Sequence, residues 1–476
     1  MSENKTEGQK LKELLSYSTK NAWEKSSEED QSEAFKFCEE YKTFLDRGKT
    51  EREFAQEVEK LAVSKGYLSL DEIIRTGQRL SSGMKVYRIN RKKSAVLSVI
   101  GEEPLQNGVN IVGAHIDSPR LDLKQNPLYE DCGLAMLKTH YYGGIKKYQW
   151  VALPLALHGV ILKADGSSIS VNIGEEAADP VFTISDLLPH LAQDQMQKKM
   201  SEAITGEGLN LLFGSIPYND EKIKDKVKLN ILKLLHDKYG VVEEDFISAE
   251  LEIVPAFQAK DVGLDRSMVG AYGQDDRVCA YTALMAILDV QQVQKTAVCL
   301  LTDKEEIGSM GNTGAESVLF ENFMADILSL SVDNYNDVLL RRCLESSRML
   351  SADVNPAVDP NYESVHEKRN ASFLGKGLVI QKYTGSRGKA GGSDANAEYV
   401  AELRHLFNAK GILWQSAELG KVDQGGGGTI AQFVANLGIE VIDCGVAILS
   451  MHAPFEITSK IDIYISYKAY KVFYGI

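Results

Sequence analysis

The stretch TAVCLLTDKEEIGSMG, residues 296–311, decides the fold class. Its apolar run 297–301 is continuous rather than alternating, which predicts a strand of a parallel sheet that is buried on both faces. Glu305 and Glu306 follow this run closely. Ligands of open α/β sheets bind beyond the carboxyl ends of such strands. Two adjacent carboxylates there repel each other unless a cation or a shared proton offsets their charge; a solvated acidic turn is the alternative for the pair alone.

The composition is that of an ordinary globular protein. Its 476 residues suffice for roughly two to four domains, and 44% of them are hydrophobic. The net charge of −14 argues against a surface that binds nucleic acid or an anionic membrane. The six cysteines form no CxxC pair, so we expect reduced thiols and not a disulfide framework or a zinc-thiolate site.

Targeting and membrane segments are not expected. The N-terminal stretch MSENKTEGQKLKELL is charged and lacks the apolar core of a secretory signal. The most apolar long stretch, 150–164, is short and is interrupted by Pro154 and His158, so it is not expected to span a bilayer. We therefore expect a soluble cytoplasmic protein.

The pattern of apolar residues changes twice along the chain. Residues 8–65 carry apolar residues at three- and four-residue steps, which predicts helix. Residues 124–253 contain short alternating stretches separated by turn signals, which predicts a β-rich module with a helix near 221–239. The α/β parts should contain helices at 277–290, 313–325, 393–410 and 429–437, and strands at 108–114, 296–301, 327–332 and 439–444. This order predicts one α/β domain interrupted by an inserted β-rich domain.

Residue types that can bind metals occur where the expected strands and helices meet loops. GAHIDSP places His115 at a strand end and Asp117 two residues later, on the same side of an extended segment. YGQDDR places Asp275 and Asp276 at the mouth of a helix. A helix cap explains one of these two carboxylates. A carboxylate in that place can also bridge two divalent cations.

A further carboxylate has two candidates. Asp333 follows the expected strand 327–332 directly, and Asp353 follows a shorter apolar run. From the bare residues, Asp333 has the better placement at a strand end. Among the eight histidines, His115 and His452 are the two that lie beyond strand-like runs of the α/β part.

Strand ends that offer His, Asp, a Glu pair and His match the ligand demand of a dinuclear zinc hydrolase. One carboxylate bridges the metals, and one unligated glutamate is left as general base. The glycine loop 425–428 lacks the lysine of a phosphate loop, which argues against nucleotide binding. Its glycines would let main-chain amides approach a bound peptide closely.

The motifs resemble those of the aspartyl aminopeptidase / aminopeptidase I family of dinuclear zinc metallopeptidases. The matching stretches are GAHIDSPRLDLK, YGQDDR, TDKEEIGSMG, SADVNPAVDPNYE and LSMHAPFE, and they span the chain from about residue 80 to its end. The resemblance implies a mixed-sheet α/β/α zinc-peptidase catalytic domain built from residues 1–121 and 263–476. Residues 122–262 would form an inserted β-rich dimerisation domain.

The resemblance also implies a role for each motif. His115 and Asp353 would hold one zinc ion, Glu306 and His452 the other, and Asp275 would bridge them. It thereby favours Asp353 over Asp333. The implied catalytic residues are Glu305 as general base, Asp117 to orient the site, and His190, which would reach a neighbouring subunit's site and stabilise the oxyanion. Two Zn²⁺ per subunit are implied, with Co²⁺ or Mn²⁺ as substitutes.

The implied activity is removal of the N-terminal residue from peptides by a homo-oligomer of dimers assembled into a tetrahedral dodecamer. An acidic and a neutral, leucine-like preference both stay open, because Lys382, Arg387 and Lys389 do not align securely with the family's basic specificity residue. One alternative is another co-catalytic zinc hydrolase, such as a carboxypeptidase or deacylase. A non-catalytic shell protein of the same fold is the alternative from a different class.

Overall fold

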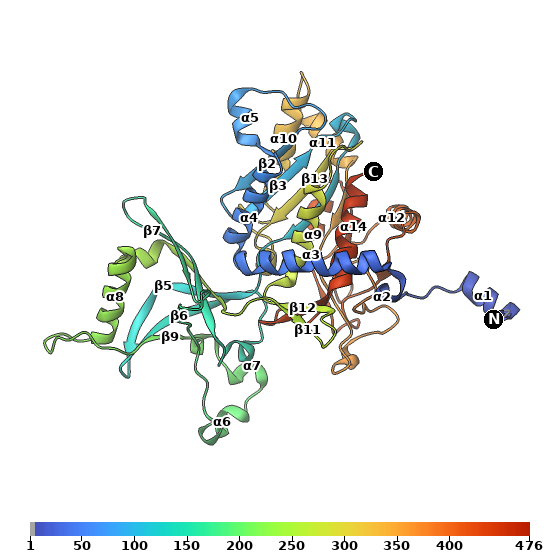
Figure 1. Ribbon diagram of the computed structural model, residues 1–476. Helices are drawn as coiled ribbons and strands as arrows, with labels where there is room; N and C mark the ends of the chain where they lie inside the picture. Colours follow the sequence, from blue (N-terminus) through green and yellow to red (C-terminus); the bar gives the residue numbers. More distant parts are fainter. Residues whose placement is uncertain (1–4) are drawn as a thin grey trace.

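The computed structural model describes residues 5–476, which build a mixed α/β fold around a nine-stranded sheet (Figure 1). The strand order of this sheet is β1-β2-β3-β13-β4-β14-β20-β16-β18. Its strands are β1 (Leu68–Ser69), β2 (Lys85–Asn90), β3 (Ser94–Val99), β4 (Asn110–His115), β13 (Ala297–Thr302), β14 (Arg348–Ser351), β16 (Leu378–Gln381), β18 (Trp414–Ser416) and β20 (Glu440–Gly445).

Strand β13 lies in the interior of the sheet, where the sequence predicts it. It runs parallel to β4 and antiparallel to β3, so the sheet is mixed and not wholly parallel. Every residue of β3, β4 and β13 is buried, which confirms the expected burial on both faces. Because β13, β4, β14 and β20 run in the same direction, their carboxyl ends lie at one edge.

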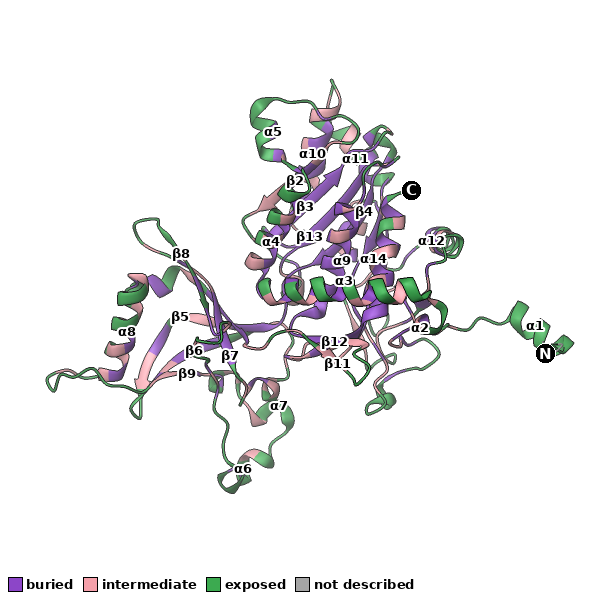
Figure 2. Ribbon diagram, viewed as in Figure 1, coloured by how far each residue is buried: buried purple, intermediate pink, exposed green. Residues whose placement is uncertain are grey.

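Helices cover both faces of the nine-stranded sheet. Ala297, Cys299 and Leu301 of β13 belong to one core, and Val298 and Leu300 belong to the other. The first core includes residues of α3 (Glu28–Arg47), α4 (Glu51–Ser64), α9 (Gln274–Leu288), α12 (Ala397–Ala409) and α14 (Lys460–Tyr474). The second includes residues of α5 (Leu70–Thr76), α10 (Leu319–Ser331), α11 (Asp337–Glu345) and α13 (Ala431–Ala435). Figure 2 shows the strands as a buried layer between these helices, which confirms the α/β/α architecture.

The strand expected at 327–332 is wrong, because residues 327–331 belong to helix α10. The helix expected at 313–325 begins only at Leu319 and continues to Ser331. Phe320, Phe323 and Ile327 recur at helical spacing and are buried in the second core. Asp333 therefore follows a helix end and not a strand end. Its side chain is 94% exposed and pairs with Arg79.

A second, six-stranded antiparallel sheet is formed within the segment 120–255, with the order β8-β7-β10-β5-β6-β9. It extends to the left in Figure 1 and has a separate hydrophobic core. Its strands are β5 (Arg120–Asp131), β6 (Leu134–Tyr142), β7 (Leu155–Leu162), β8 (Ser168–Ile173), β9 (Leu211–Gly214) and β10 (Ala249–Pro255). Helices α6 (Gln193–Met196), α7 (Met200–Ala203) and α8 (Lys226–Tyr239) accompany it. The helix expected near 221–239 is α8, and the β-rich texture is confirmed; the boundaries 121/122 and 262/263 stay a prediction.

A five-stranded sheet has the order β11-β12-β22-β21-β15. It consists of β11 (Lys260–Val262), β12 (Met268–Ala271), β22 (Glu456–Ser459), β21 (Ala447–Leu449) and β15 (Asn355–Pro356). Strand β12 leads into α9, and the loop between β21 and β22 contains His452. This sheet therefore places the start of α9 beside that loop.

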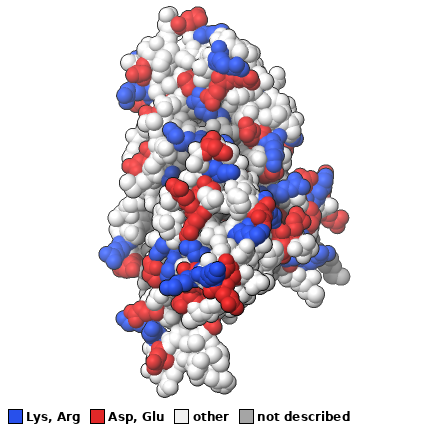
Figure 3. Space-filling model, turned by 90° about the vertical axis from the view of Figure 1, so that its left-hand side faces the viewer, with Lys and Arg blue, Asp and Glu red and all other residues white. Residues whose placement is uncertain are grey.

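The remaining elements are short. They are α1 (Glu7–Leu15), α2 (Ala22–Lys25), β17 (Gly385–Ser386) and β19 (Gly426–Gly427). The cysteines are free, and Cys132 is exposed whereas the other five are buried. Among residues 5–476, no helix combines the length and apolar character that crossing a bilayer requires. Figure 3 shows acidic and basic side chains intermingled on the face that it presents.

Candidate metal centre

The candidate site lies at the carboxyl edge of β4, β13 and β14. Strand β4 ends at His115, Glu305 opens a 3-10 turn (Glu305–Ile307) beyond β13, and Asp353 follows β14. Chain segments that are far apart in sequence meet here because these three strands are neighbours in parallel register. The predicted residues that come together are His115, Asp117, Asp275, Glu305, Glu306, Asp353 and His452.

The two histidines present the same ring atom to the site. The Nδ1 of His115 lies 3.0 Å from the main-chain carbonyl of Asp117. The Nδ1 of His452 lies 2.8 Å from the carbonyl of Gly144. A carbonyl only accepts hydrogen bonds, so each Nδ1 carries the proton and each Nε2 has a free lone pair in the neutral ring. This is the tautomer that a metal-ligating histidine requires.

Asp275 lies between these two Nε2 atoms. Its Oδ1 is 3.3 Å from Nε2 of His115, and its Oδ2 is 3.2 Å from Nε2 of His452. Its backbone is non-helical although it lies within α9, and it is joined to Asp276 by a cis peptide bond. Ser118 Oγ donates to the carbonyl of Asp275 at 2.6 Å. One carboxylate thus faces a histidine with each of its oxygens, the arrangement that a bridging ligand needs.

Three groups of ligand atoms lie close enough to hold an ion, each group with its atoms within 4.8 Å of one another. The groups are His115–Glu305–Glu306, His115–Asp276–Asp353 and Asp275–Glu306–His452. Both carboxylate oxygens of Asp276 and Oε1 of Glu306 are buried without a hydrogen-bond partner in the described chain. An unpartnered buried carboxylate is costly, so a cation in these groups fits the residues present.

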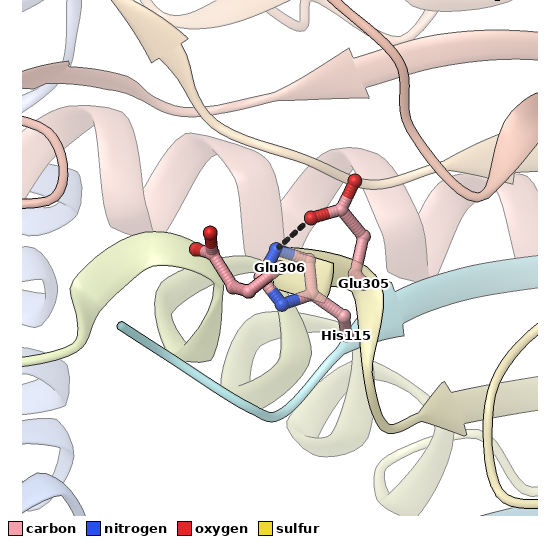
Figure 4. Close-up of side chains that lie close together, drawn as sticks. All are labelled: His115, Glu305 and Glu306. Carbon is pink, nitrogen blue, oxygen red and sulfur yellow. Dashed lines mark ion pairs between the residues drawn. The ribbon is translucent and has the colours of Figure 1, made fainter. Parts of the chain in front are cut away.

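Glu305 and Glu306 differ in their surroundings. The side chain of Glu306 is 3% exposed and its Oε1 lies 3.5 Å from Nε2 of His452. The side chain of Glu305 is 17% exposed and its Oε2 lies 3.8 Å from Nε2 of His115 (Figure 4). Glu305 is therefore the member of the pair that is nearer to solvent.

Asp117 supports the turn that carries the glutamates. Its Oδ1 accepts the main-chain N–H of Glu305 at 3.1 Å, and its Oδ2 accepts that of Glu306 at 3.2 Å. The hydroxyl of Tyr142 also donates to Oδ2, at 2.8 Å. Asp117 is fully buried, so these bonds hold the Glu305–Glu306 turn in one position against the His115 segment.

Burial dominates the electrostatics of the acidic groups. It raises the pKa of Glu305 to about 7, and it raises the pKa values of Glu306 and Asp353 well above their usual range. Burial alone would lower the pKa of His452, but its contact with Asp275 and the nearby charge of Glu306 raise that pKa to about 11. Burial thus disfavours the charged form of these carboxyl groups, whereas the carboxylates beside His452 favour its charged form.

A cavity of about 570 Å³ opens onto these residues. The glycine loop 425–428 forms part of its wall, as the sequence suggests for a peptide site. Of the three basic candidates, Arg387 and Lys389 line this cavity and Lys382 does not. Lys382 and Lys389 both pair with Asp394, whereas Arg387 forms no ion pair with any residue in 5–476.

His190 is not brought to this centre within one chain. It lies in an exposed 3-10 turn (Pro189–Leu191) just before α6, the short helix at the bottom of Figure 1. It does not line the cavity beside Glu305. Asp333 is not part of the centre either. It forms an ion pair with Arg79 on the surface.

Sequence reasoning left Asp276 without a role. A helix cap was one explanation for an acid at this position, but neither carboxylate oxygen of Asp276 accepts a hydrogen bond within residues 5–476. Asp276 instead lies with His115 and Asp353 in one ion-sized group. The doubled acid in YGQDDR was the available signal, since a cap uses only one carboxylate.

Residues 44–474 match the family model described as aminopeptidase I zinc metalloprotease (M18). The chain belongs to this family. A probable M18 family aminopeptidase 1 of Clostridium acetobutylicum is 57% identical over 454 residues, which are 95% of this chain and 97% of that protein. The M18 chain is accordingly a zinc-dependent aminopeptidase, a hydrolase of the exopeptidase class.

Solved structures agree with this membership. A crystal structure of an M18 family aminopeptidase from Thermotoga maritima superimposes with a TM-score of 0.92 at 46% identity, over 97% of this chain and 100% of that one. Aminopeptidase I from Clostridium acetobutylicum gives 0.91 at 53% identity, with the same coverage. The S. cerevisiae mApe1 dodecamer gives 0.73 at 21% identity, over 92% of this chain and 96% of that one, a likeness of fold alone.

Proposed function

We propose that this M18 aminopeptidase uses two zinc ions, with Asp275 as the ligand shared between them. The observation that carries the proposal is the placement of the Asp275 oxygens, 3.3 and 3.2 Å from the Nε2 atoms of His115 and His452. Asp353 would complete the ligands of the ion near His115, and Glu306 those of the ion near His452. Co²⁺ and Mn²⁺ accept the same nitrogen and oxygen ligands and would substitute.

Asp276 extends this assignment. Its two unpartnered oxygens lie in the same group as His115 and Asp353. This position of Asp276 is compatible with two roles. Asp276 binds the ion near His115 directly, or it lies as a buried charge behind the residues that bind that ion. In either case Asp276 adds negative charge to the His115 side of the centre, which would strengthen binding of the cation there.

Glu305 would act as the general base. Bound zinc polarises a peptide carbonyl and lowers the pKa of water. Glu305 would take the proton from the attacking water and return it to the leaving amine. Two features support this role: Glu305 is more exposed than Glu306, and it faces the cavity while its main chain is fixed by Asp117.

The substrates would be peptides with a free N-terminus. Their amino group is a cation, and the acidic excess of the centre would attract it. An acidic or a leucine-like N-terminal residue fits the cavity wall: Arg387 offers an unpaired guanidinium, and Met451 and Leu419 offer apolar surface. The free cysteines fit a cytoplasmic location for the enzyme.

His190 would act on a neighbouring subunit. His190 is exposed and does not line the cavity of its own chain. A homo-oligomer in which residues 122–262 form the dimerisation domain would let it reach another subunit's cavity and stabilise the oxyanion. Dimers assembled into a tetrahedral dodecamer, the number named for the S. cerevisiae relative, are the proposed state.

A substrate panel combined with metal analysis tests the proposal. Aminoacyl-anilides with free amines should be cleaved, whereas N-blocked anilides and peptides that offer only a free C-terminus should not. Metal analysis of the active protein should give two zinc ions per chain. Cleavage of N-blocked substrates would instead favour a deacylase, and one zinc per active chain would refute the bridging role of Asp275.

A further inference from the structure

We propose that Glu456 is a positioning residue of the metal centre, which fixes the main chain of both His452 and Asp275 with one carboxylate. The inference rests on the proposed function, because it takes His452 and Asp275 as zinc ligands. Glu456 itself does not belong to any of the three ion-sized groups. It would act on the metal only through the two residues that it holds.

The two oxygens of Glu456 have separate partners. Oε1 accepts the main-chain N–H of His452 at 2.7 Å. Oε2 accepts the main-chain N–H of Asp275 at 3.1 Å. The side chain is 1% exposed, so water does not compete for these bonds. The Glu456 side chain thereby joins Asp275, which lies 181 residues away along the chain, to His452, which lies 4 residues away.

The main chain of Glu456 is itself fixed by strand pairing and hydrogen bonds. It opens strand β22 and pairs with Ala271 of β12. Gln274 Nε2 donates to the carbonyl of Glu456 at 2.7 Å and to that of Val269 at 3.1 Å. A carboxylate mounted on a paired strand and cross-linked by a buried amide has little freedom to move, which is what a positioning group requires.

The His452 bond also offsets an unfavourable backbone. The φ angle of His452 is +64°, in the left-handed region that a residue with a Cβ seldom adopts. The N–H bond to Glu456 and the Nδ1 contact with Gly144 hold the residue at two points. Together they keep Nε2 aimed at Asp275, whereas relaxation of the backbone would turn the ring away.

The effect should be uneven between the two proposed zinc ions. The group Asp275–Glu306–His452 contains both residues that Glu456 holds. The group His115–Asp276–Asp353 contains neither. Loss of Glu456 should therefore weaken the ion near His452 more than the ion near His115.

Glu456→Gln tests this, because the amide keeps the size but has only one oxygen to accept an N–H bond. The metal-depleted full chain is titrated with Zn²⁺ against a chromogenic chelator, and with Co²⁺ while the visible absorption spectrum is recorded. Of the two zinc affinities, we expect that of the ion near His115 to change less and that of the ion near His452 to fall about 10–100-fold, the usual range for groups that orient a ligand. The Co²⁺ spectrum of that ion should change as well.

Asp462→Asn is the matched control. Asp462 is fully buried, and its two oxygens accept the main-chain N–H groups of Gly375 and Gly377 at 2.6 and 2.7 Å. It therefore loses the same kind of bond in the same burial, but it contacts none of the candidate ligands. Its zinc affinities and Co²⁺ spectrum should match those of the wild type, even if its unfolding temperature falls.

The outcomes separate the inference from the proposed function. If the wild type binds fewer than two zinc ions, the proposed dinuclear centre fails. If the wild type binds two and Glu456→Gln binds both with unchanged affinity and spectrum, only the role of Glu456 fails. An equal loss in Asp462→Asn would also overturn it. Should Glu456→Gln not fold, Glu456→Asp keeps both acceptors on a shorter stem, and undiminished zinc affinity there would refute the inference.

Discussion

Buried charge is handled in opposite ways in two regions of this molecule. At the metal centre, the carboxylates of Asp276 and Glu306 retain buried oxygens without hydrogen-bond partners in the described chain. Where the start of helix α4 meets the six-stranded sheet, four charged side chains hydrogen-bond one another. We call this second region the junction cluster; it consists of Lys49, Glu53, His158 and Glu175.

The junction cluster is closed on itself. His158 Nδ1 lies 2.8 Å from Glu53, and its Nε2 lies 3.0 Å from Glu175. Lys49 Nζ donates to both oxygens of Glu175 at 2.6 and 2.8 Å, and to the carbonyl of Pro255 at 2.9 Å. Charges satisfied within the fold contribute to structure, whereas the open acidic excess at the metal centre requires a cation from outside. The difference separates a structural cluster from a reactive one.

The largest expected effect is at the metal centre. Glu305→Gln removes the proposed base, so we expect kcat to fall about 10²–10⁴-fold while zinc content is retained. Anilide hydrolysis and metal analysis measure the two quantities. Glu316→Gln, the same change at an exposed residue of the loop before α10, should behave as wild type. Zinc loss in Glu305→Gln would instead make Glu305 a ligand, and near-normal kcat would remove it from the mechanism.

The junction cluster should respond in stability rather than activity. Lys49→Met keeps the length of the side chain but leaves Glu175 without its ammonium partner, and breaking a buried pair from one side costs about 3–5 kcal/mol. Urea unfolding measures the loss. Lys60→Met changes an exposed lysine of α4, whose one ion pair among residues 5–476 is with Glu57, and should leave unfolding unaffected. If Lys49→Met were equally stable, the junction cluster would not be structural.

Removal of metal should distinguish the two regions directly. For each bound ion, chelation should lower the free energy of unfolding by about 2.7 kcal/mol relative to protein held at a hundredfold excess of zinc over the dissociation constant of that ion. Hydrogen exchange should quicken at 274–279 and 451–456, the segments that supply candidate ligands. The segments 49–53 and 157–160 should exchange as before. Equal acceleration in both regions would mean that the metal supports the whole fold.

The smallest expected effect is a pH dependence in the junction cluster. Burial lowers the pKa of His158, but the bonds to Glu175 and Glu53 outweigh it and the pKa is raised. A raised folded-state pKa stabilises fully below the unfolded value of about 6.5, and the gain is lost as pH rises through the folded value. Lys49, Glu53, Glu175 and Asn172 are the polar groups that face the ring or its carboxylate partners.

His158→Gln measures this contribution. Below pH 6.5 the variant should be less stable than wild type by about 1.5–3 kcal/mol, the range for hydrogen bonds to a charged group, and this difference in stability should narrow as pH rises. Urea unfolding between pH 6 and pH 9 gives the comparison. His236→Gln, at an exposed histidine of α8, should show no such trend. A constant gap across this range would mean that His158 does not titrate there.

Much of the catalytic part could be predicted from local pattern. The run 297–301 indicated an interior strand because nothing in it alternates, and β13 is buried along its whole length. The run 327–332 was wrongly predicted as a strand, because a short apolar segment fits a strand and a helix equally well. The helical spacing of apolar residues from Phe320 onwards indicates the helix that the structure contains. The prediction that Asp333 lies at a strand end is wrong for the same reason.

The sequence by itself determined which chemistry is available: histidines and carboxylates beyond apolar runs, a glutamate pair, and no thiolate site. Residue type and local periodicity carry that information along the chain. Only the tertiary structure decided the partners, because parallel register sets which strand ends are neighbours. It placed Asp276 beside Asp353, left His190 remote, and gave Glu456 two main-chain donors from distant segments. Such contacts depend on packing, which no local pattern records.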